Sequence, residues 1–89
     1  MAHRRWMRCA LRALTLYSRQ GCHLCEDFLE ALSPLIRGRA RVDVTDIDTD
    51  PELVAAYGVR VPVLCDGETL ICEAFVDARA VREHLDATD

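Results

Sequence analysis

Two cysteines three residues apart, Cys22 and Cys25, are the residues of this chain whose types and spacing suit redox chemistry. Apolar residues 14–17 precede a polar break at 18–21, and a helical pattern follows, which predicts both cysteines at a helix N-terminus. The unpaired N–H groups and partial positive charge there stabilise a thiolate and lower the pKa of the nearest cysteine. We therefore expect Cys22 to be the exposed nucleophile and Cys25 the more buried resolving thiol.

The spacing of the two thiols also allows a small disulfide ring, because residues three apart are neighbours on one helical face. The expected reaction is thiol–disulfide exchange, in which the Cys22 thiolate attacks a substrate disulfide and Cys25 resolves the mixed disulfide. Protonated His23 would lower the pKa of Cys22, whereas Glu26 and Asp27 would raise it, and with the helix N-terminus we expect a net lowering. An exposed polar residue without a tuning role describes His23 equally well.

The chain contains five cysteines, an odd number, at positions 9, 22, 25, 65 and 72. Their spacings do not resemble the disulfide framework of a small secreted protein. With no export signal in the sequence, the thiols are expected in a reducing cytosol, and the protein is predicted to be cytoplasmic. A cysteine pair in that compartment is redox-active or metal-binding more often than structural.

Two of the other cysteines lie in a predicted hairpin, on either side of Asp66-Gly67. If these two residues form the centre of the turn, the register pairs Cys65 with Glu68, Leu64 with Thr69, and Val61 with Cys72. Cys65 and Cys72 would then be on the order of 13 Å apart along the ladder. We expect both to be small apolar residues rather than disulfide partners or ligands.

Composition predicts one domain with a basic arm. The 89 residues are 51% apolar, enough for a single core. Residues 1–12 hold four arginines and no acid, so we predict an N-terminal arm there and a single domain at residues 13–89. The arm lacks the apolar region of a signal peptide, and we expect a solvated tail rather than a nucleic-acid-binding segment. No apolar run approaches the roughly 20 residues of a transmembrane helix, so neither membrane nor nucleic acid is expected as a partner.

The remaining elements are expected to hold the cysteine pair in place. Strands are predicted at residues 13–17, 40–47, 59–65 and 69–73, and helices at 22–32, around 51–57 and at 78–86. Ser33-Pro34 should end or kink the first helix, and Leu35 and Ile36 could continue its apolar face to Gly38. Asp77 should cap the last helix. The acidic residues 43–52 are explained better by caps and solvated loops than by a cation site. The order β-α-β-α-β-β-α predicts an α/β domain with helices on both faces of one sheet.

Three segments together resemble the glutaredoxin branch of the thioredoxin-fold superfamily, closest to the small bacterial glutaredoxin-like proteins: LTLYSRQGCHLC, DIDTDPELVAAYGV and RVPVL. The resemblance implies a thioredoxin/glutaredoxin-like fold, with a central four-stranded mixed sheet flanked by helices. It also implies that Pro62 is cis and lies against the cysteines, so that the backbone of Val61 can pair with an extended substrate. Arg19, three residues before Cys22, would favour the thiolate and could bind a glutathione carboxylate.

The sequence departs from the glutaredoxin pattern in the places that hold glutathione. His23-Leu24 stands between the cysteines instead of Pro-Tyr, and Arg60-Val61-Pro62 replaces Thr-Val-Pro. Residues 71–77 replace the Gly-Gly and Cys-Asp or Ser-Asp elements. Glutathione as the physiological partner therefore does not follow from the resemblance, although Arg19 and Arg60 could still offer it complementary charge.

These observations predict a thiol–disulfide oxidoreductase that uses Cys22 and Cys25 on a disulfide-containing protein or a glutathione mixed disulfide. The candidate substrate-binding residues are Arg19, His23, Arg60, Val61 and Pro62. No tightly bound cofactor or metal is expected; glutathione could be a co-substrate, and a cellular thiol would be the reductant. Two alternatives stay open: a zinc or iron–sulfur site completed by a dimer or glutathione, and a non-catalytic interaction module.

Overall fold

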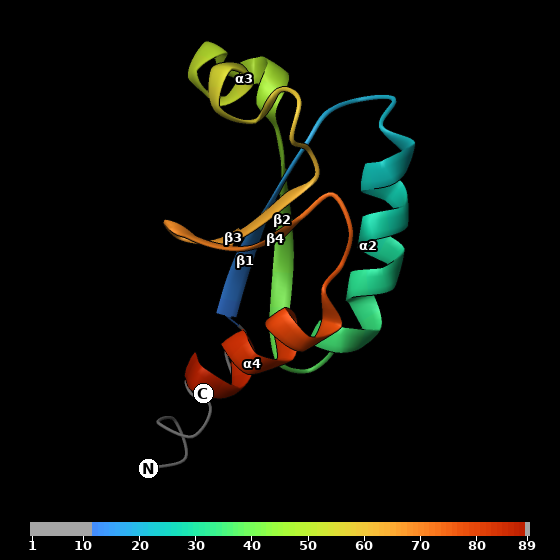
Figure 1. The fold of residues 1–89 in the computed structure, drawn as a ribbon, viewed down its shortest axis with the longest axis vertical. Helices are drawn as coiled ribbons and strands as arrows, with labels where there is room; N and C mark the ends of the chain where they lie inside the picture. The colour runs from blue at the N-terminus through green and yellow to red at the C-terminus, as the bar shows by residue number, and fades with distance from the viewer. Residues whose placement is uncertain (1–11, 89) are drawn as a thin grey trace.

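The computed structural model describes residues 12–88, in which strands and helices follow the predicted order with one added 3-10 turn (Figure 1). Arg12, assigned to the arm by its charge, is the first residue of β1. The rest of the arm, including Cys9, lies outside the described residues. The elements are β1 (Arg12–Ser18), α2 (His23–Ile36), β2 (Ala40–Asp46), η1 (Ile47–Thr49), α3 (Pro51–Tyr57), β3 (Val63–Asp66), β4 (Thr69–Glu73) and α4 (Ala78–Thr88).

The four strands form one mixed sheet in the order β2-β1-β3-β4. β1 runs parallel to β2 and antiparallel to β3, and β4 returns antiparallel to β3. The pairing of Tyr17 with Val63 brings the start of β3 to the end of the sheet where β1 leads into the cysteine loop. The predicted four-stranded mixed sheet is confirmed, and its register sets two loops beside each other at that end.

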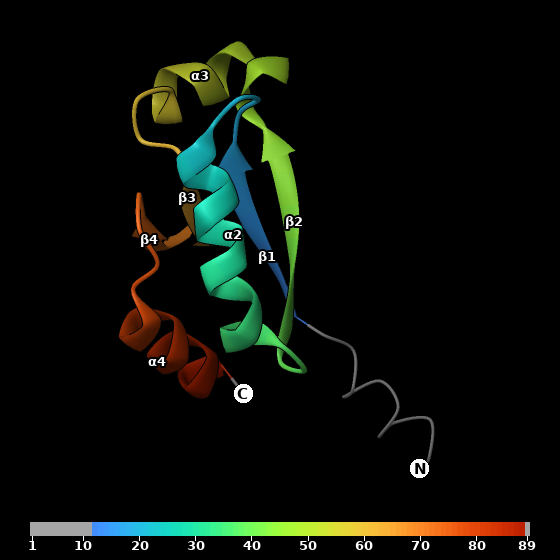
Figure 2. The same ribbon diagram turned by 90° about the vertical axis from the view of Figure 1, so that its right-hand side faces the viewer.

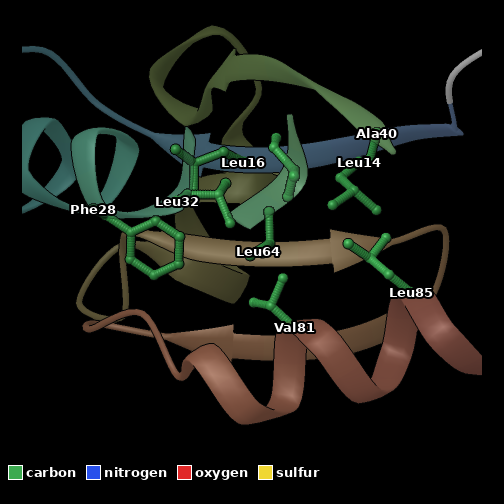
Figure 3. Close-up of a cluster of buried hydrophobic side chains, with 9 residues drawn as sticks. Leu14, Leu16, Phe28, Leu32, Ala40, Leu64, Val81 and Leu85 are labelled. Atoms are coloured by element: carbon green, nitrogen blue, oxygen red, sulfur yellow. The ribbon is translucent and has the colours of Figure 1, made fainter. Parts of the chain in front are cut away.

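The main core lies between one face of the sheet and the helices α2 and α4, which Figure 2 shows on the same side. Alternate residues of a strand point to the same face, so Leu14 and Leu16 of β1 face the helices together with Leu64 of β3. Figure 3 shows this cluster. Both helices contribute buried residues at helical spacing to it: Phe28, Leu32 and Ile36 from α2, and Val81 and Leu85 from α4.

The opposite face of the sheet is covered differently from the prediction of helices on both faces. Val63 and Cys65 are buried there, and the ring of Tyr57 in α3 stacks on that of Tyr17, with ring centroids 4.4 Å apart. α3 itself buries no residue, and Figure 1 places it at one end of the sheet. This short helix therefore caps the end of the second face instead of forming a full layer over it.

The first helix continues through Pro34 to Ile36, which is the continuation that the sequence left open beyond Leu32. Proline removes one backbone donor and favours a helix end, but Leu32 and Ile36 are both buried against the sheet. Packing of this apolar stripe therefore outweighs the local preference. At the other end of the fold, Asp77 accepts a hydrogen bond from the backbone N–H of Ala80 at 3.0 Å, which confirms the predicted cap of α4.

The predicted third strand begins four residues too early. The backbone N–H groups of Arg60 and Val61 both donate to the carbonyl oxygen of Tyr57, at 2.8 and 3.1 Å, so they belong to a turn after α3. Pro62 has no N–H to donate to a ladder. Strand β3 can therefore start only at Val63.

The predicted register of the hairpin is also wrong. Asp66 pairs with Thr69, so Gly67 and Glu68 are the central turn residues, and Leu64 pairs with Cys72. Gly67 has a φ of +60°, which suits the first central position of a type II′ turn. A bulge between Leu64 and Cys65 accounts for the remaining shift. Cys65 and Cys72 are nevertheless free thiols, as predicted.

Helices long and apolar enough to cross a bilayer are absent from residues 12–88.

Candidate active site

Cys22 and Cys25 form a disulfide at the N-terminus of α2. Their Cα atoms are 5.2 Å apart, within the range of disulfides in proteins. Cys22 is the N-cap residue, and its Sγ accepts a hydrogen bond from the backbone N–H of Cys25 at 3.1 Å. That contact satisfies one of the free N–H groups at the helix end and would stabilise negative charge on the same sulfur after reduction.

The two sulfur-bearing residues differ in exposure. Cys22 is half-buried, whereas Cys25 is only 5% exposed and faces the core. A substrate arriving from solvent therefore meets Cys22 first, and the buried Cys25 is placed to react with the Cys22 sulfur beside it. The predicted mechanism, in which Cys22 attacks the substrate and Cys25 resolves the adduct, requires this difference in exposure. The roles of the two cysteines stay predictions.

The loop between β1 and α2 presents Cys22 at the edge of an open pocket of about 230 Å³. Gly21 precedes Cys22 with a φ of +76°, a conformation that favours glycine, and this turn directs the chain from the strand into the helix. The pocket combines polar loop residues with an apolar floor. It is lined by Leu16, Ser18, Arg19, Gln20, Gly21, Cys22, Cys25, Glu26, Leu29 and Val44.

The peptide bond between Val61 and Pro62 is cis. Because Pro62 directly precedes β3, the strand register places it at the end of the sheet that carries the cysteine loop. Figures 1 and 2 show the chain between α3 and β3 approaching the N-terminal end of α2 in both views. The N–H of Val61 already donates to the carbonyl oxygen of Tyr57 at 3.1 Å. An extended substrate that pairs with the N–H of Val61 would therefore have to compete with the carbonyl oxygen of Tyr57.

Arg19 lies on the pocket, but its guanidinium is bound by the protein itself. Nε and Nη2 donate to the two carboxylate oxygens of Asp48 at 3.2 and 2.6 Å, and Nη1 donates to the carbonyl oxygen of Gly58 at 3.1 Å. The hydrogen bond from Arg19 lowers the pKa of Asp48, so this carboxylate is ionised at neutral pH. A glutathione carboxylate would have to compete with Asp48 for the same fork of donors.

Arg60 is held in the same way by Glu73. Nε and Nη2 donate to the two carboxylate oxygens at 3.1 and 2.9 Å, and the guanidinium lies 5.4 Å from the ring centroid of Tyr57. The hydrogen bond from Arg60 also lowers the pKa of Glu73. This Arg60–Glu73 clamp joins the segment before the cis-proline to the end of β4.

We predict that Glu73→Gln lowers stability at neutral pH and that the loss disappears in acid. A carboxylate whose pKa is lowered by folding stabilises the folded state above its unfolded pKa, and that contribution is lost as the pH falls through the lowered value. The difference from wild type should therefore shrink between pH values of about 5 and 3. Chemical denaturation of both proteins across that range measures it.

The control for this prediction is Glu83→Gln, because Glu83 pairs with Arg79 one turn away on the exposed face of α4. That pair joins two residues of a single helix, so its loss should change the denaturation midpoint less than loss of the clamp at neutral pH. A Glu73→Gln protein that matches wild type at neutral pH would contradict a stabilising clamp.

The structure brings only some of the predicted site residues together. Arg19, Cys22 and Cys25 share one pocket, whereas His23, Arg60, Val61 and Pro62 do not line it. His23 is exposed as the first residue of α2, so the choice between a tuning role and a plain surface position stays open.

Sequence reasoning missed the carboxylates that bind the two arginines. The acidic stretch was expected to supply caps, and Asp46 and Asp50 do accept backbone N–H groups at the starts of η1 and α3. Asp48 instead turns toward Arg19, 29 positions earlier. Within residues 12–88, no group of three or more His, Cys, Asp and Glu side chains is placed to hold a metal ion. Metal binding by Cys22 and Cys25 would thus need ligands from elsewhere.

The chain matches the family described as "Glutaredoxin-like domain (DUF836)" over residues 13–86. Among solved structures, it resembles the X-ray structure of Northeast Structural Genomics target protein XcR50 from X. campestris, at 42% identity and a TM-score of 0.69. That alignment covers 83% of this chain and 96% of the other. The solution structure of the same target is 44% identical with a TM-score of 0.64, covering 84% and 94%.

No curated protein matches the chain. The structural neighbours confirm the predicted thioredoxin/glutaredoxin-like fold, since the alignment covers most of both chains. The family match includes the cysteine pair and the cis-proline within one continuous segment. The chain therefore belongs to the glutaredoxin-like domain (DUF836) family.

Proposed function

We propose that this protein is a thiol–disulfide oxidoreductase whose redox couple is Cys22 and Cys25. The observation that carries the proposal is the disulfide between a half-buried N-cap cysteine and a cysteine buried in the core. A thiolate of Cys22 receives the stabilisation of the helix N-terminus and the N–H of Cys25. Membership of a glutaredoxin-like family supports the same chemistry.

In the proposed reaction, the Cys22 thiolate attacks one sulfur of a substrate disulfide. A bond forms between Cys22 and that sulfur, the substrate S–S bond breaks, and the departing thiolate takes up a proton. Deprotonated Cys25 then attacks the Sγ of Cys22, which releases the second substrate thiol and leaves the Cys22–Cys25 disulfide. Two electrons pass from the protein to the substrate, and a cellular thiol would restore the reduced pair.

Disulfide-containing proteins suit this site better as substrates than glutathione does. Both arginines that could bind glutathione carboxylates, Arg19 and Arg60, are held in bidentate contacts by Asp48 and Glu73. We propose glutathione only as a possible co-substrate, with no tightly bound cofactor, and a reducing cytosol as the setting. Arg19, His23, Arg60, Val61 and Pro62 stay candidates for contact with substrate.

The test is a redox titration. The protein is equilibrated with graded ratios of reduced to oxidised glutathione, its free thiols are alkylated, and intact mass and peptide mapping identify each species. We expect a reversible Cys22–Cys25 disulfide that accumulates over a narrow range of potential, about 30 mV for each tenfold change in the ratio of the two forms. If Cys22 stays reduced throughout, or a metal ion protects it from alkylation, the proposal fails.

A further inference from the structure

The segment that replaces the glutathione-binding elements of glutaredoxins has a defined and unusual backbone. Ala74 has a φ of +69°, which is rare for a residue with a side chain, and the N–H of Phe75 donates to the carbonyl oxygen of Glu73 at 2.8 Å. Together they form a γ-turn with a positive φ at its centre. Such strain persists only where the surroundings enforce it, and it points toward function.

Two contacts hold this turn against the cis-proline segment. The N–H of Ala74 donates to the carbonyl oxygen of Pro62 at 2.8 Å, and the Arg60–Glu73 clamp lies immediately beside it. Glu73 pairs with Val63, which pairs in turn with Tyr17, so the turn lies at the end of the sheet where β1 leads into the loop that carries Cys22. The turn is thus fixed at the end of the sheet that carries the redox pair.

The turn displays a large apolar side chain to solvent. Phe75 is 71% exposed, and Val59, in the segment before Pro62, is fully exposed. Isolated exposed apolar residues are ordinary, but this phenylalanine sits on a strained turn that is bonded to the residue before β3. An aromatic ring on a rigid support loses little side-chain entropy when a partner covers it.

The charges near the redox pair favour a polypeptide substrate over glutathione. The guanidinium groups of Arg19 and Arg60 are neutralised by Asp48 and Glu73, and the whole chain has a net charge of −4. Glutathione is anionic and small, so it gains little electrostatic attraction from arginines that are already paired. A polypeptide with an apolar residue next to its disulfide cysteine can cover the ring of Phe75 while its sulfur reaches Cys22.

We propose that Phe75 is a specificity-determining residue that packs against an apolar side chain next to the disulfide of an extended polypeptide substrate. This inference rests on the proposed thiol–disulfide exchange and names its substrate class. The reaction at Cys22 and Cys25 is unchanged; Phe75 raises the rate for polypeptide disulfides with an apolar neighbour and leaves glutathione disulfide unaffected.

The experiment compares three oxidants against the fully reduced protein. They are a synthetic peptide closed by one disulfide with leucine on both sides of one cysteine, the same peptide with serine there, and oxidised glutathione. Acid quenching, alkylation and peptide mapping of Cys22 give the second-order rate constant for each. For Phe75→Ala, we expect a loss of at least about tenfold with the leucine peptide and less than about twofold with the other two oxidants.

Two further variants separate recognition from general damage. Phe75→Leu should retain most of the rate with the leucine peptide, because it keeps an apolar contact. Leu70→Ala should retain all of it, since Leu70 is an exposed apolar residue of the same hairpin, 46% exposed, that pairs with Cys65 away from the turn.

Each outcome bears on one of the two proposals. If wild type exchanges with these oxidants and Phe75→Ala keeps its rate with the leucine peptide, the inference about Phe75 is overturned while the proposed function stands. An equal loss with all three oxidants also overturns it, because Phe75 would then support the site as a whole. If wild type reacts with none of them, the proposed function fails and takes the inference with it.

Discussion

Cys25→Ser is expected to stop the reaction at a mixed disulfide between Cys22 and its substrate. The half-buried Cys22 sulfur can still attack, but the buried thiol that would resolve the adduct is gone. Well-placed intramolecular groups reach effective concentrations of about 10⁵ M, so resolution by millimolar external thiol should be at least about a thousandfold slower. Non-reducing mass spectrometry after addition of a disulfide peptide should show the adduct, mapped to Cys22.

Cys22→Ser is the matched control, since it removes the exposed sulfur and leaves the buried one. We expect neither exchange nor adduct from this variant, because Cys25 is 5% exposed and has no direct access to a polypeptide disulfide. If Cys22→Ser instead forms an adduct at Cys25, the two cysteines have the opposite roles. If Cys25→Ser turns over at the wild-type rate, a two-cysteine mechanism is wrong.

The features that sequence predicted well are those that neighbouring residues determine. The placement of Cys22 at a helix start follows from the change of pattern at residues 18–21, and Cys22 is indeed the N-cap residue of α2. Strand β4 has its predicted bounds, and Asp77 caps α4 through the N–H three residues later. In each case, the deciding interaction joins residues only a few positions apart.

Predictions failed where residues distant in sequence decide the structure. The local pattern left open whether the helix ends at Pro34, and Pro34 stays inside α2 because Leu32 and Ile36 are buried by the sheet. The hairpin register depends on where Gly67 sits in the turn and on a bulge that only the facing strand defines. Cys65 pairs with Leu70, two positions beyond the predicted Glu68, and the bulge adds a third position at Leu64, which pairs with Cys72 instead of Thr69.

The same reason explains what was missed in the site. Sequence indicates that Arg19 and Arg60 are cationic, and glutaredoxin resemblance suggests a carboxylate ligand for each. Their partners in the fold are Asp48 and Glu73, 29 and 13 positions away. A charge predicted to attract substrate is thereby paired within the protein, and a carboxylate ligand would have to compete with that internal partner.

Leu64→Ala is expected to destabilise the protein by about 2–5 kcal/mol, the cost of removing a buried leucine side chain and leaving a cavity. Leu64 is 0% exposed, and it pairs with Leu16 and Cys72 on the face that α2 and α4 cover. Small domains are stable by about 5–15 kcal/mol, so this one change would remove a large fraction of that stability. Denaturation in urea at a fixed redox state measures the loss.

The redox state must be fixed because closing the Cys22–Cys25 disulfide changes the unfolded chain as well as the folded one. Leu70→Ala is the control on the same hairpin: Leu70 is half exposed, so its truncation removes less buried surface and should cost well under half as much. Equal losses at the two positions would mean that the space between β3, α2 and α4 is not the core that holds the fold. If Leu64→Ala lowers the free energy of unfolding only slightly, neighbouring side chains must collapse into the cavity. Protein interiors packed at crystal-like density resist such a collapse.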